Sequence, residues 1–280
     1  MANEGNDNQK HIYDNYLKAN TNNIWCPGCG NGIVLQALIR AIDSLHINTD
    51  KVVNVSGIGC SSRGGGYLNL CGMHTTHGRA IAFATGIKLY NPELVVIVLT
   101  GDGDCASIGG NHFIHAARRN INLTTIIVNN YNYGMTGGQY SSTTPTGKIT
   151  KTSVNGNIER PFDMCRIAQS AGATYVARAT TYHTNLLQEY ISKGISHNGF
   201  SVIDVLSDCP TNYGNMNEKG RAKDMILSWK DKKIWKNEGS NMAPQDSTID
   251  YIGEFCENNS IPEYTDCYNK TVIHLRKDDF

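Results

Sequence analysis

The chain lacks an excess of charge of either sign. Its 280 residues include 25 basic and 25 acidic side chains, and the basic residues form no stripe along the sequence. Proteins that bind nucleic acid carry a concentrated positive patch. The balance therefore argues against nucleic acid as the main partner.

Long hydrophobic runs are also missing. The longest, Leu94–Leu99, is far shorter than the ~20 residues that a membrane-spanning helix needs. The polar residues at the start of the chain lack the apolar core of a signal peptide. We therefore expect a cytoplasmic protein that contacts no membrane.

A disulfide framework is a third feature that the sequence does not favour. The nine cysteines are an odd number, and a cytoplasmic chain of this length does not depend on disulfides to fold. Reduced thiols that hold a metal, with others buried as small apolar side chains, are the better interpretation.

Patterns of buried strands and of helices alternate over most of the chain. The β-branched run at residues 94–99 is typical of a strand buried on both faces, and residues 33–45 have the apolar spacing of an amphipathic helix. This alternation predicts an α/β fold with a doubly wound parallel sheet. The expected strands span residues 51–55, 94–99, 123–128, 174–177 and 201–206, and the expected helices span residues 33–45, 79–89, 109–119, 162–171 and 185–196.

We expect three parts along the chain. Residues 1–24 form an N-terminal arm, residues 25–209 form the α/β domain, and residues 210–280 form a polar, partly helical extension without strands that packs on a partner subunit. Within the domain, a Gly/Thr/Ser/Pro-rich stretch from 134 to 156 is long enough to indicate a functional loop.

Polar residues follow two predicted strands. Asp102 and Asp104 come directly after one strand, and Asn130 follows the next. Ligands bind at the carboxyl ends of parallel strands, and the adjoining glycines and helix N-terminus suit phosphates. Asp102, the Asn130 side chain and a backbone carbonyl near Asn132 would supply oxygens to Mg²⁺ beside a diphosphate. Taken alone, the Asp102 motif is better explained by an Asp that caps a helix, and the Asn130 motif by an Asn-rich turn. Together, on neighbouring strands, the two motifs favour the magnesium-diphosphate site.

The Cys26-Pro-Gly-Cys29 motif has three interpretations. It resembles a redox dithiol, which normally follows a strand in a smaller fold. Structural zinc needs a second pair of ligands, and the sequence has no second CxxC and no matching His pair. An iron–sulfur cubane takes four thiolates that can come from distant positions, and Cys60 and Cys209 stand in loops at strand ends. On these residues alone the choice of four thiolates stays open.

His77 follows His74 at a spacing of three, which is compatible with metal binding. A histidine near the start of a helix is more often a capping or core residue. If a diphosphate lies nearby, His77 becomes a candidate contact to it.

In this order, these residues resemble the beta subunit of the 2-oxoacid:ferredoxin oxidoreductases, which depend on thiamine diphosphate. The resemblance continues to Asp208-Cys-Pro210. The matching segments are Trp25-Cys-Pro-Gly-Cys-Gly30, Gly57-Ile-Gly-Cys-Ser-Ser-Arg63, His74-Thr-Thr-His-Gly-Arg-Ala80, Gly101-Asp-Gly-Asp104, Ser107-Ile-Gly-Gly-Asn-His112 and Asn129–Gln139.

The resemblance implies three cofactors. It assigns a 4Fe–4S cluster to Cys26, Cys29, Cys60 and Cys209, and it assigns Mg²⁺ to Asp102, Asn130 and the backbone carbonyl of Asn132. It places thiamine diphosphate against Ile58, Gly59, Cys60, Ser61, His77, Gly103, Asp104, Gly134 and Met135. Residues 25–209 then form the domain that binds both thiamine diphosphate and the cluster.

The implied activity is the CoA-dependent oxidative decarboxylation of a 2-oxoacid, with electrons passed through the cluster to ferredoxin. The segments after Met135 look closest to enzymes that convert 2-oxoglutarate to succinyl-CoA and CO₂. Branched-chain 2-oxoacids and pyruvate are the alternative substrates. Some 2-oxoglutarate relatives carry Lys where Gly137 stands, so Arg63 is a candidate replacement contact or a surface residue.

The implied partners follow from what the chain contains. A diphosphate-binding domain is recognisable, whereas the pyrimidine-binding domain with its activating Glu is not. We therefore expect an alpha subunit that supplies this Glu and most contacts to CoA and the 2-oxoacid, with small gamma and delta subunits as further candidate partners. The sequence argues against two other classes of protein. Intact Asp102 and Asn130 argue against a non-catalytic iron–sulfur electron-transfer subunit, and the four cysteines argue against a thiamine carboligase or decarboxylase.

Overall fold

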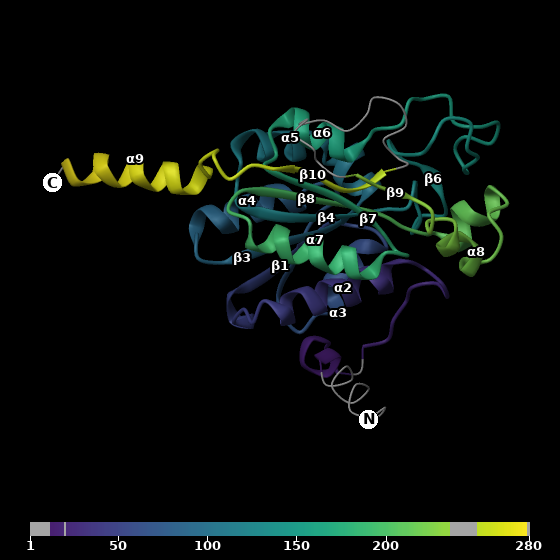
Figure 1. Ribbon diagram of the computed structural model, residues 1–280, viewed down its shortest axis with the longest axis horizontal. Helices are drawn as coiled ribbons and strands as arrows, with labels where there is room; N and C mark the ends of the chain where they lie inside the picture. Colours follow the sequence, from purple (N-terminus) through teal and green to yellow (C-terminus); the bar gives the residue numbers. More distant parts are fainter. Residues whose placement is uncertain (1–11, 20, 236–250, 279–280) are drawn as a thin grey trace.

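The computed structural model describes residues 12–19, 21–235 and 251–278. Its centre is an eight-stranded sheet with the order β2-β1-β3-β4-β8-β7-β10-β9, shown in Figure 1. The strands are β1 (Val52–Ser56), β2 (Cys71–His74), β3 (Val95–Gly101), β4 (Leu123–Asn129), β5 (Asn132–Tyr133), β6 (Gln139–Tyr140), β7 (Tyr175–Thr180), β8 (Phe200–Leu206), β9 (Lys233–Trp235) and β10 (Tyr251–Glu257). The pair β5 and β6 forms a separate small sheet.

Helices cover both faces of the large sheet. The α-helices are α2 (Asn31–Ser44), α3 (Gly64–Tyr67), α4 (Ala80–Tyr90), α5 (Gly110–Arg119), α6 (Met164–Ala171), α7 (Thr184–Ser196), α8 (Ala222–Leu227) and α9 (Tyr264–Asp278). The shorter helical turns are η1 (Thr49–Lys51), η2 (Ser61–Arg63), η3 (Gly103–Ile108) and η4 (Pro210–Gly214). In Figure 1, α2 and α7 lie on one side of the sheet, and α5 and α6 lie on the other.

The apolar core follows these two layers. One cluster joins α2 and α7 to one face of the sheet, and the other joins α4, α5 and α6 to the opposite face. Every residue of β1, β4, β7 and β8 is buried, as expected for parallel strands that are covered twice. The predicted α/β class with a doubly wound sheet is confirmed.

The C-terminal region departs from the sequence analysis. We expected no strands in residues 210–280, and this was wrong because β9 and β10 extend the sheet beyond β7. β10 pairs with β7 in the antiparallel direction, and its Phe255 packs into the core with 1% of its surface exposed. Polar residues, Gly253 and a β-bulge interrupt its pattern, which explains why periodicity did not reveal it.

Segments at both ends lie against or beyond this body. In the expected arm 1–24, Tyr16 is buried against the core, while residues 1–11 and 20 fall outside the described residues. At the other end, α9 points away from the sheet (Figure 1). Packing of residues 210–280 on a partner stays a prediction, and residues 236–250 are outside the described part.

A buried ion-pair network fixes the sheet near the carboxyl end of β4. Arg178 is fully buried, and its guanidinium donates to Asp204 Oδ2 and to Asp163 Oδ1, both at 2.8 Å. Asp204 Oδ1 accepts a further hydrogen bond, at 3.2 Å, from Asn129. This network anchors the end of β4, immediately before Asn130.

Candidate cofactor site

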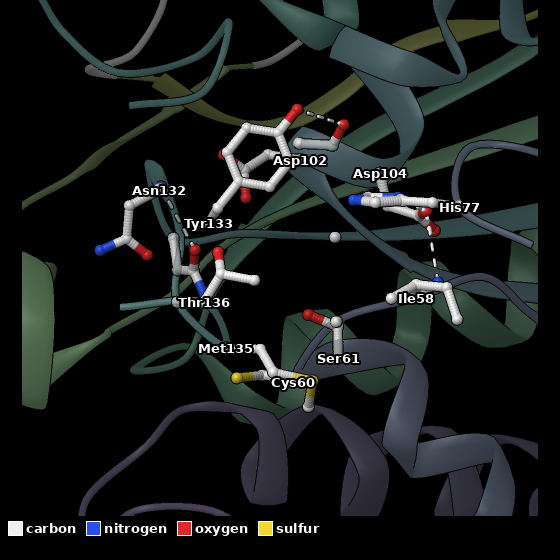
Figure 2. A pocket seen from close by; sticks show the side chains of 15 residues that line it. Ile58, Cys60, Ser61, His77, Asp102, Asp104, Asn132, Tyr133, Met135 and Thr136 are labelled. Atoms are coloured by element: carbon white, nitrogen blue, oxygen red, sulfur yellow. Dashed lines mark hydrogen bonds and ion pairs between the residues drawn. The ribbon is translucent and has the colours of Figure 1, made fainter. Parts of the chain in front are cut away.

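A cavity of about 80 Å³ lies at the carboxyl ends of β3 and β4. Figure 2 shows Asp102 and Tyr133 toward one end of it and Cys60, Ser61 and Met135 toward the other. The structure brings together here every residue expected to contact thiamine diphosphate or Mg²⁺. These residues are Ile58, Gly59, Cys60, Ser61, His77, Asp102, Gly103, Asp104, Asn130, Asn132, Gly134 and Met135. Their roles toward a cofactor stay predictions.

Asp102 is buried at the end of β3, where two hydroxyl groups hold its carboxylate. Ser141 and Thr143 both donate to Oδ2, the latter at 2.7 Å. Burial raises the pKa of the Asp102 carboxyl to about 6, and these hydrogen bonds oppose that rise. A cation beside the carboxylate would favour its charged form further.

The Asn130 side-chain amide faces three oxygen atoms of two neighbouring residues. They are Asp102 Oδ1 at 3.3 Å, Asn132 Oδ1 at 3.2 Å and the Asn132 carbonyl oxygen at 2.9 Å, and the amide NH₂ can donate to all three. If a cation lies among these groups, the amide can turn its oxygen inward instead. Because Mg²⁺ prefers oxygen ligands and needs few from the protein when a diphosphate is present, these residues fit the ion.

Asp104 organises the loops around the cavity. Its Oδ1 accepts hydrogen bonds from the backbone N–H of Gly78 at 2.7 Å and of Ile58 at 3.3 Å, and it also contacts His77 Nδ1. Its Oδ2 accepts from the Thr100 hydroxyl at 2.7 Å. Since protein donors already fill the carboxylate, a contact from this residue to a cofactor would come from its backbone.

Two glycines leave room that this arrangement requires. A Cβ at Gly57 would lie 1.9 Å from Asp104 Oδ2, and a Cβ at Gly103 would lie 2.5 Å from the Tyr133 ring. The Tyr133 hydroxyl donates to the Gly103 carbonyl at 3.1 Å, and Gly103 begins the π-helical turn η3 that leads into α5. Such turns are frequent at functional sites.

Five residues of this site, Gly101 among them, were given no role from the sequence. Tyr133 and Thr136 line the cavity, and Ser141 and Thr143 hold Asp102 from the long Gly/Thr/Ser/Pro-rich stretch. The available signal was the length and the hydroxyl content of that stretch, which indicated a functional loop without saying where it returns.

The four cysteines assigned to the cluster line one adjoining cavity, of about 50 Å³. A Cβ at Gly134 would lie 3.5 Å from Cys209 Sγ and 3.6 Å from Cys60 Sγ. The two cavities have a common wall formed by Cys60, Asn130, Gly134 and Met135. A group held by the thiols would therefore be next to a group held in the cofactor cavity.

Local contacts bring the thiols together from three distant segments. The Trp25 indole donates to the Cys60 carbonyl at 2.7 Å, which ties the CxxC segment to the loop after β1. The Gly30 N–H donates to the Asp208 carbonyl at 3.2 Å, beside Cys209. Asn31, the first residue of α2, donates its side-chain amide to Cys29 Sγ at 3.1 Å.

The thiols also influence one another electrostatically. Burial, and to a smaller degree the charges of the other three cysteines, raises the pKa of the Cys60 thiol to about 11. Burial likewise raises the pKa of Cys29, while hydrogen bonds from Asn31 lower it. Such mutual effects show that the four thiols lie close together. A metal that binds them would have to displace their protons.

Four thiols that line one cavity are the donor set that a 4Fe–4S cluster takes. Within the described ranges, no three His, Cys, Asp or Glu side chains converge closely enough to share one metal ion. A 4Fe–4S cluster does not require such convergence, because each of its four thiolates binds a different iron. The expected Mg²⁺ set contains one carboxylate and two asparagines, so it does not depend on such a group either.

The other cysteines take no part in this arrangement. We expected the cysteines outside the cluster to be buried as small apolar side chains, and Cys105 and Cys165 are indeed buried in the core. Cys256 is half-buried, whereas Cys71 and Cys267 are exposed, so the expectation was wrong for the last two.

Arg63 does not reach the cofactor cavity. It is exposed and lines a separate cavity beside β2, so its expected contact to substrate has no support from this arrangement and stays a prediction. At Gly137, a Cβ would lie 2.8 Å from Lys151 Nζ. An ammonium group from the same loop thus lies beside Gly137.

The fold and the site define a class of protein. The family described as "Thiamine pyrophosphate enzyme, C-terminal TPP binding domain" matches residues 57–205, which include both strands that carry the cavity. The chain belongs to the thiamine-pyrophosphate-dependent enzymes.

Within that class, the relatives of this chain belong to a smaller family. The "2-oxoglutarate synthase subunit KorB" of Methanocaldococcus jannaschii is 49% identical over 91% of this chain and 94% of its own. The protein of the same name from Archaeoglobus fulgidus is 56% identical over 72% of this chain and 76% of its own. The "2-oxoacid:ferredoxin oxidoreductase subunit beta" of a Sulfolobus species is 46% identical over 76% and 68%.

A solved structure agrees with these relatives. The 2-oxoglutarate:ferredoxin oxidoreductase from Magnetococcus marinus, solved with 2-oxoglutarate, coenzyme A and succinyl-CoA bound, superimposes with a TM-score of 0.84. It is 32% identical, and the match covers 94% of this chain and 90% of that one. The chain belongs to the beta subunits of the 2-oxoacid:ferredoxin oxidoreductases, and the family resemblance drawn from its motifs is confirmed.

Proposed function

We propose that this chain is the beta subunit of a 2-oxoglutarate:ferredoxin oxidoreductase. The enzyme converts 2-oxoglutarate and CoA to succinyl-CoA and CO₂, and two electrons pass singly to ferredoxin. The observation that carries this proposal is the wall common to two cavities, one lined by Asp102 and Asn130 and the other by four cysteines. A decarboxylation coupled to single-electron transfer needs both groups side by side.

The residues of the first cavity would hold thiamine diphosphate and Mg²⁺. Asp102, Asn130 and the Asn132 carbonyl would bind the ion, and the ion would bind the diphosphate. When bound, thiamine diphosphate supplies the electron sink for loss of CO₂ from the 2-oxoacid. Met135, an apolar side chain at the inner wall, would set the shape into which the cofactor folds.

The residues of the second cavity would hold the 4Fe–4S cluster. Cys26, Cys29 and Cys209 would bind it from two chain segments, and Cys60 would bind it from the loop that also contacts the thiamine cofactor. This double position of Cys60 keeps the distance for electron transfer short.

The substrate is proposed from two kinds of support. Several relatives are named for 2-oxoglutarate, and the related solved structure holds it together with coenzyme A. Lys151 does not line the cofactor cavity, but it lies beside Gly137, the residue after the cavity-lining Thr136, and is a candidate cation for a second carboxylate. Branched-chain 2-oxoacids and pyruvate, which lack that carboxylate, are the alternatives.

The proposed assembly includes an alpha subunit that supplies the activating Glu and most contacts to CoA and substrate, together with ferredoxin as acceptor. Several relatives are named as subunits of larger enzymes, which supports this assembly. No helix in the described ranges has the length and apolarity to cross a membrane. A cytoplasmic location is part of the proposal.

The test is anaerobic reduction of ferredoxin by the assembled complex with CoA and each of 2-oxoglutarate, 2-oxoisovalerate and pyruvate. We expect the highest kcat/KM with 2-oxoglutarate and full contents of thiamine and iron. Cys209→Ser should abolish the reduction, whereas Cys267→Ser, at an exposed position of α9, should not. A higher kcat/KM with another 2-oxoacid would show that 2-oxoglutarate is not the preferred substrate. Iron without thiamine would indicate an electron-transfer subunit, and thiamine without iron would indicate a carboligase or decarboxylase.

A further inference from the structure

A second polar cavity, of about 290 Å³, lies on the other side of the turn that contributes Ser61 to the cofactor cavity. It is enclosed by β1, β2, the turn η2 and the start of α3. Its polar and charged lining consists of Lys18, Asn54, Ser56, Ser62, Arg63 and His74. None of these residues lines the cofactor cavity.

Three buried polar atoms in this lining have no hydrogen-bond partner. They are both polar atoms of the Asn54 side chain and the Ser62 hydroxyl oxygen. Asn54 is 2% exposed and Ser62 is fully buried. Buried polar groups are almost always hydrogen-bonded, so the two donor groups among them, the Asn54 NH₂ and the Ser62 hydroxyl, favour an occupant with acceptor atoms.

The backbone keeps Asn54 in this position. Asn54 lies on β1, and a Cβ at Gly65 would come within 2.2 Å of its Oδ1. The glycine therefore leaves room for the amide under α3, where it borders the cavity instead of packing against an apolar side chain.

The charges around the cavity have one sign. Lys18 and Arg63 are its cationic side chains, and no Asp or Glu among the described residues lines it. His74 Nδ1 lies 3.0 Å from the Ser56 hydroxyl oxygen, which joins β2 to β1 at the cavity wall. Amide and hydroxyl donors beside a guanidinium are the groups that bind the oxygens of phosphate and carboxylate.

We propose that this cavity binds a small oxyanion, a phosphate or a carboxylate group, through Asn54, Ser62 and Arg63. The site is separate from the cofactor cavity, and the proposal does not depend on the proposed reaction. Since Ser61 faces one cavity while Ser62 and Arg63 face the other, an oxyanion bound here would hold the turn from which Ser61 reaches the cofactor cavity.

Calorimetric titration of the assembled complex tests this proposal. The complex is first saturated with thiamine diphosphate and Mg²⁺, so that the probes cannot enter the cofactor cavity. Inorganic phosphate and succinate are then titrated separately, against sodium chloride at matched ionic strength. We expect one saturable site per chain, and the probe that binds more tightly identifies the ligand as a phosphate or a carboxylate.

Single substitutions test which residues bind the oxyanion. Arg63→Gln and Asn54→Leu should each weaken it by about tenfold or more, whereas Arg119→Gln, an exposed arginine at the end of α5, should leave it unchanged. Arg63 is at the surface, so its variant keeps the test decisive if Asn54→Leu does not fold. Absence of saturable binding of both probes, or binding that Arg63→Gln does not weaken, would overturn the proposal.

Discussion

Asp102 and Asp104, two side chains that line the cofactor cavity, have different roles. Asp104 uses its carboxylate to hold Ile58, His77 and Gly78, whereas the neighbouring Asp102 receives hydroxyl donors and presents its other oxygen toward Asn130. Two carboxylates of one short motif thus divide into a structural group and a candidate metal ligand. The division follows from which donors surround each of them.

A hydrogen bond to one thiol gives a prediction at this scale. Asn31→Leu removes the donor that lies 3.1 Å from Cys29 Sγ. Hydrogen bonds to its sulfurs help to set the potential of an iron–sulfur cluster, and we expect their loss to lower it. The fall should be about 40 mV, which corresponds to ~1 kcal/mol for one electron.

The measurement is a redox titration followed by electron paramagnetic resonance. Gln36→Leu, an exposed position on the same helix, is the matched control and should leave the potential unchanged. An Asn31→Leu protein with an intact cluster signal and the original potential would contradict the role of Asn31.

Lys151 gives a second prediction. Its Nζ lies beside Gly137, and a cation there can attract the distal carboxylate of 2-oxoglutarate. We expect Lys151→Met to raise KM for 2-oxoglutarate about fivefold, since an exposed ion pair contributes up to ~1 kcal/mol, without changing KM for pyruvate. Steady-state kinetics of the complex measure both, with Lys148→Met as control. Equal effects on the two substrates would argue against a carboxylate contact.

At the scale of elements, β7, β8 and β4 are joined by a buried ion pair. Arg178→Met leaves Asp204 buried without its cation, which should reduce the free energy of unfolding by about 3–5 kcal/mol. Urea denaturation followed by circular dichroism measures this change. Arg119→Gln, at the surface, should alter stability by less than ~0.5 kcal/mol. The double variant Arg178→Met/Asp204→Asn also removes the unpaired charge. If it recovers none of the lost free energy of unfolding, the loss has another origin.

The elements that the sequence predicted are those with an unambiguous pattern. β3 and β4 are nearly continuous apolar or β-branched runs, and β8 is one that only Ser201 and Asp204 interrupt; burial on two faces accounts for that composition. β2 could not be recognised, because its four residues are all exposed. β10 carries a glycine with φ of +138° and a bulge, which disturb the alternation that marks a strand.

The candidate site was predictable for a related reason. Because parallel strands end at one edge of a sheet, the motifs after β3 and β4 had to meet. The hydroxyl groups of Ser141 and Thr143 reach Asp102 over sequence separations of 39 and 41 residues, through a loop whose path has no periodic signal. The position of Arg63 could not be predicted either. The short helical turn η2 directs neighbouring residues to different cavities, and the sequence does not show which residue faces which cavity.

The whole molecule presents an apolar surface that suits a subunit contact. Met73, Phe83, Ile87 and Tyr90 line a shallow hollow over α4 and β2, and Tyr90 is 92% exposed. Exposed apolar patches of this kind mark interaction sites. This surface therefore favours a contact with another subunit.

The corresponding prediction concerns the isolated chain. Loaded anaerobically with iron, sulfide, thiamine diphosphate and Mg²⁺, it should show a cluster spectrum yet reduce no ferredoxin with 2-oxoglutarate and CoA, because in the proposed assembly the alpha subunit supplies the activating Glu. Addition of that subunit should restore turnover, measured as ferredoxin reduction. Turnover by the isolated chain would refute the division of labour.

The position of Cys26 has a consequence for oxygen. This cysteine is exposed, and Ile24 beside it is 58% exposed, so one corner of a cluster bound there would be open to solvent unless another protein covers it. The same opening that would let an acceptor approach within short reach would admit dioxygen. The enzyme should therefore lose its iron in air fastest when it is idle, and a docked acceptor or partner should protect it.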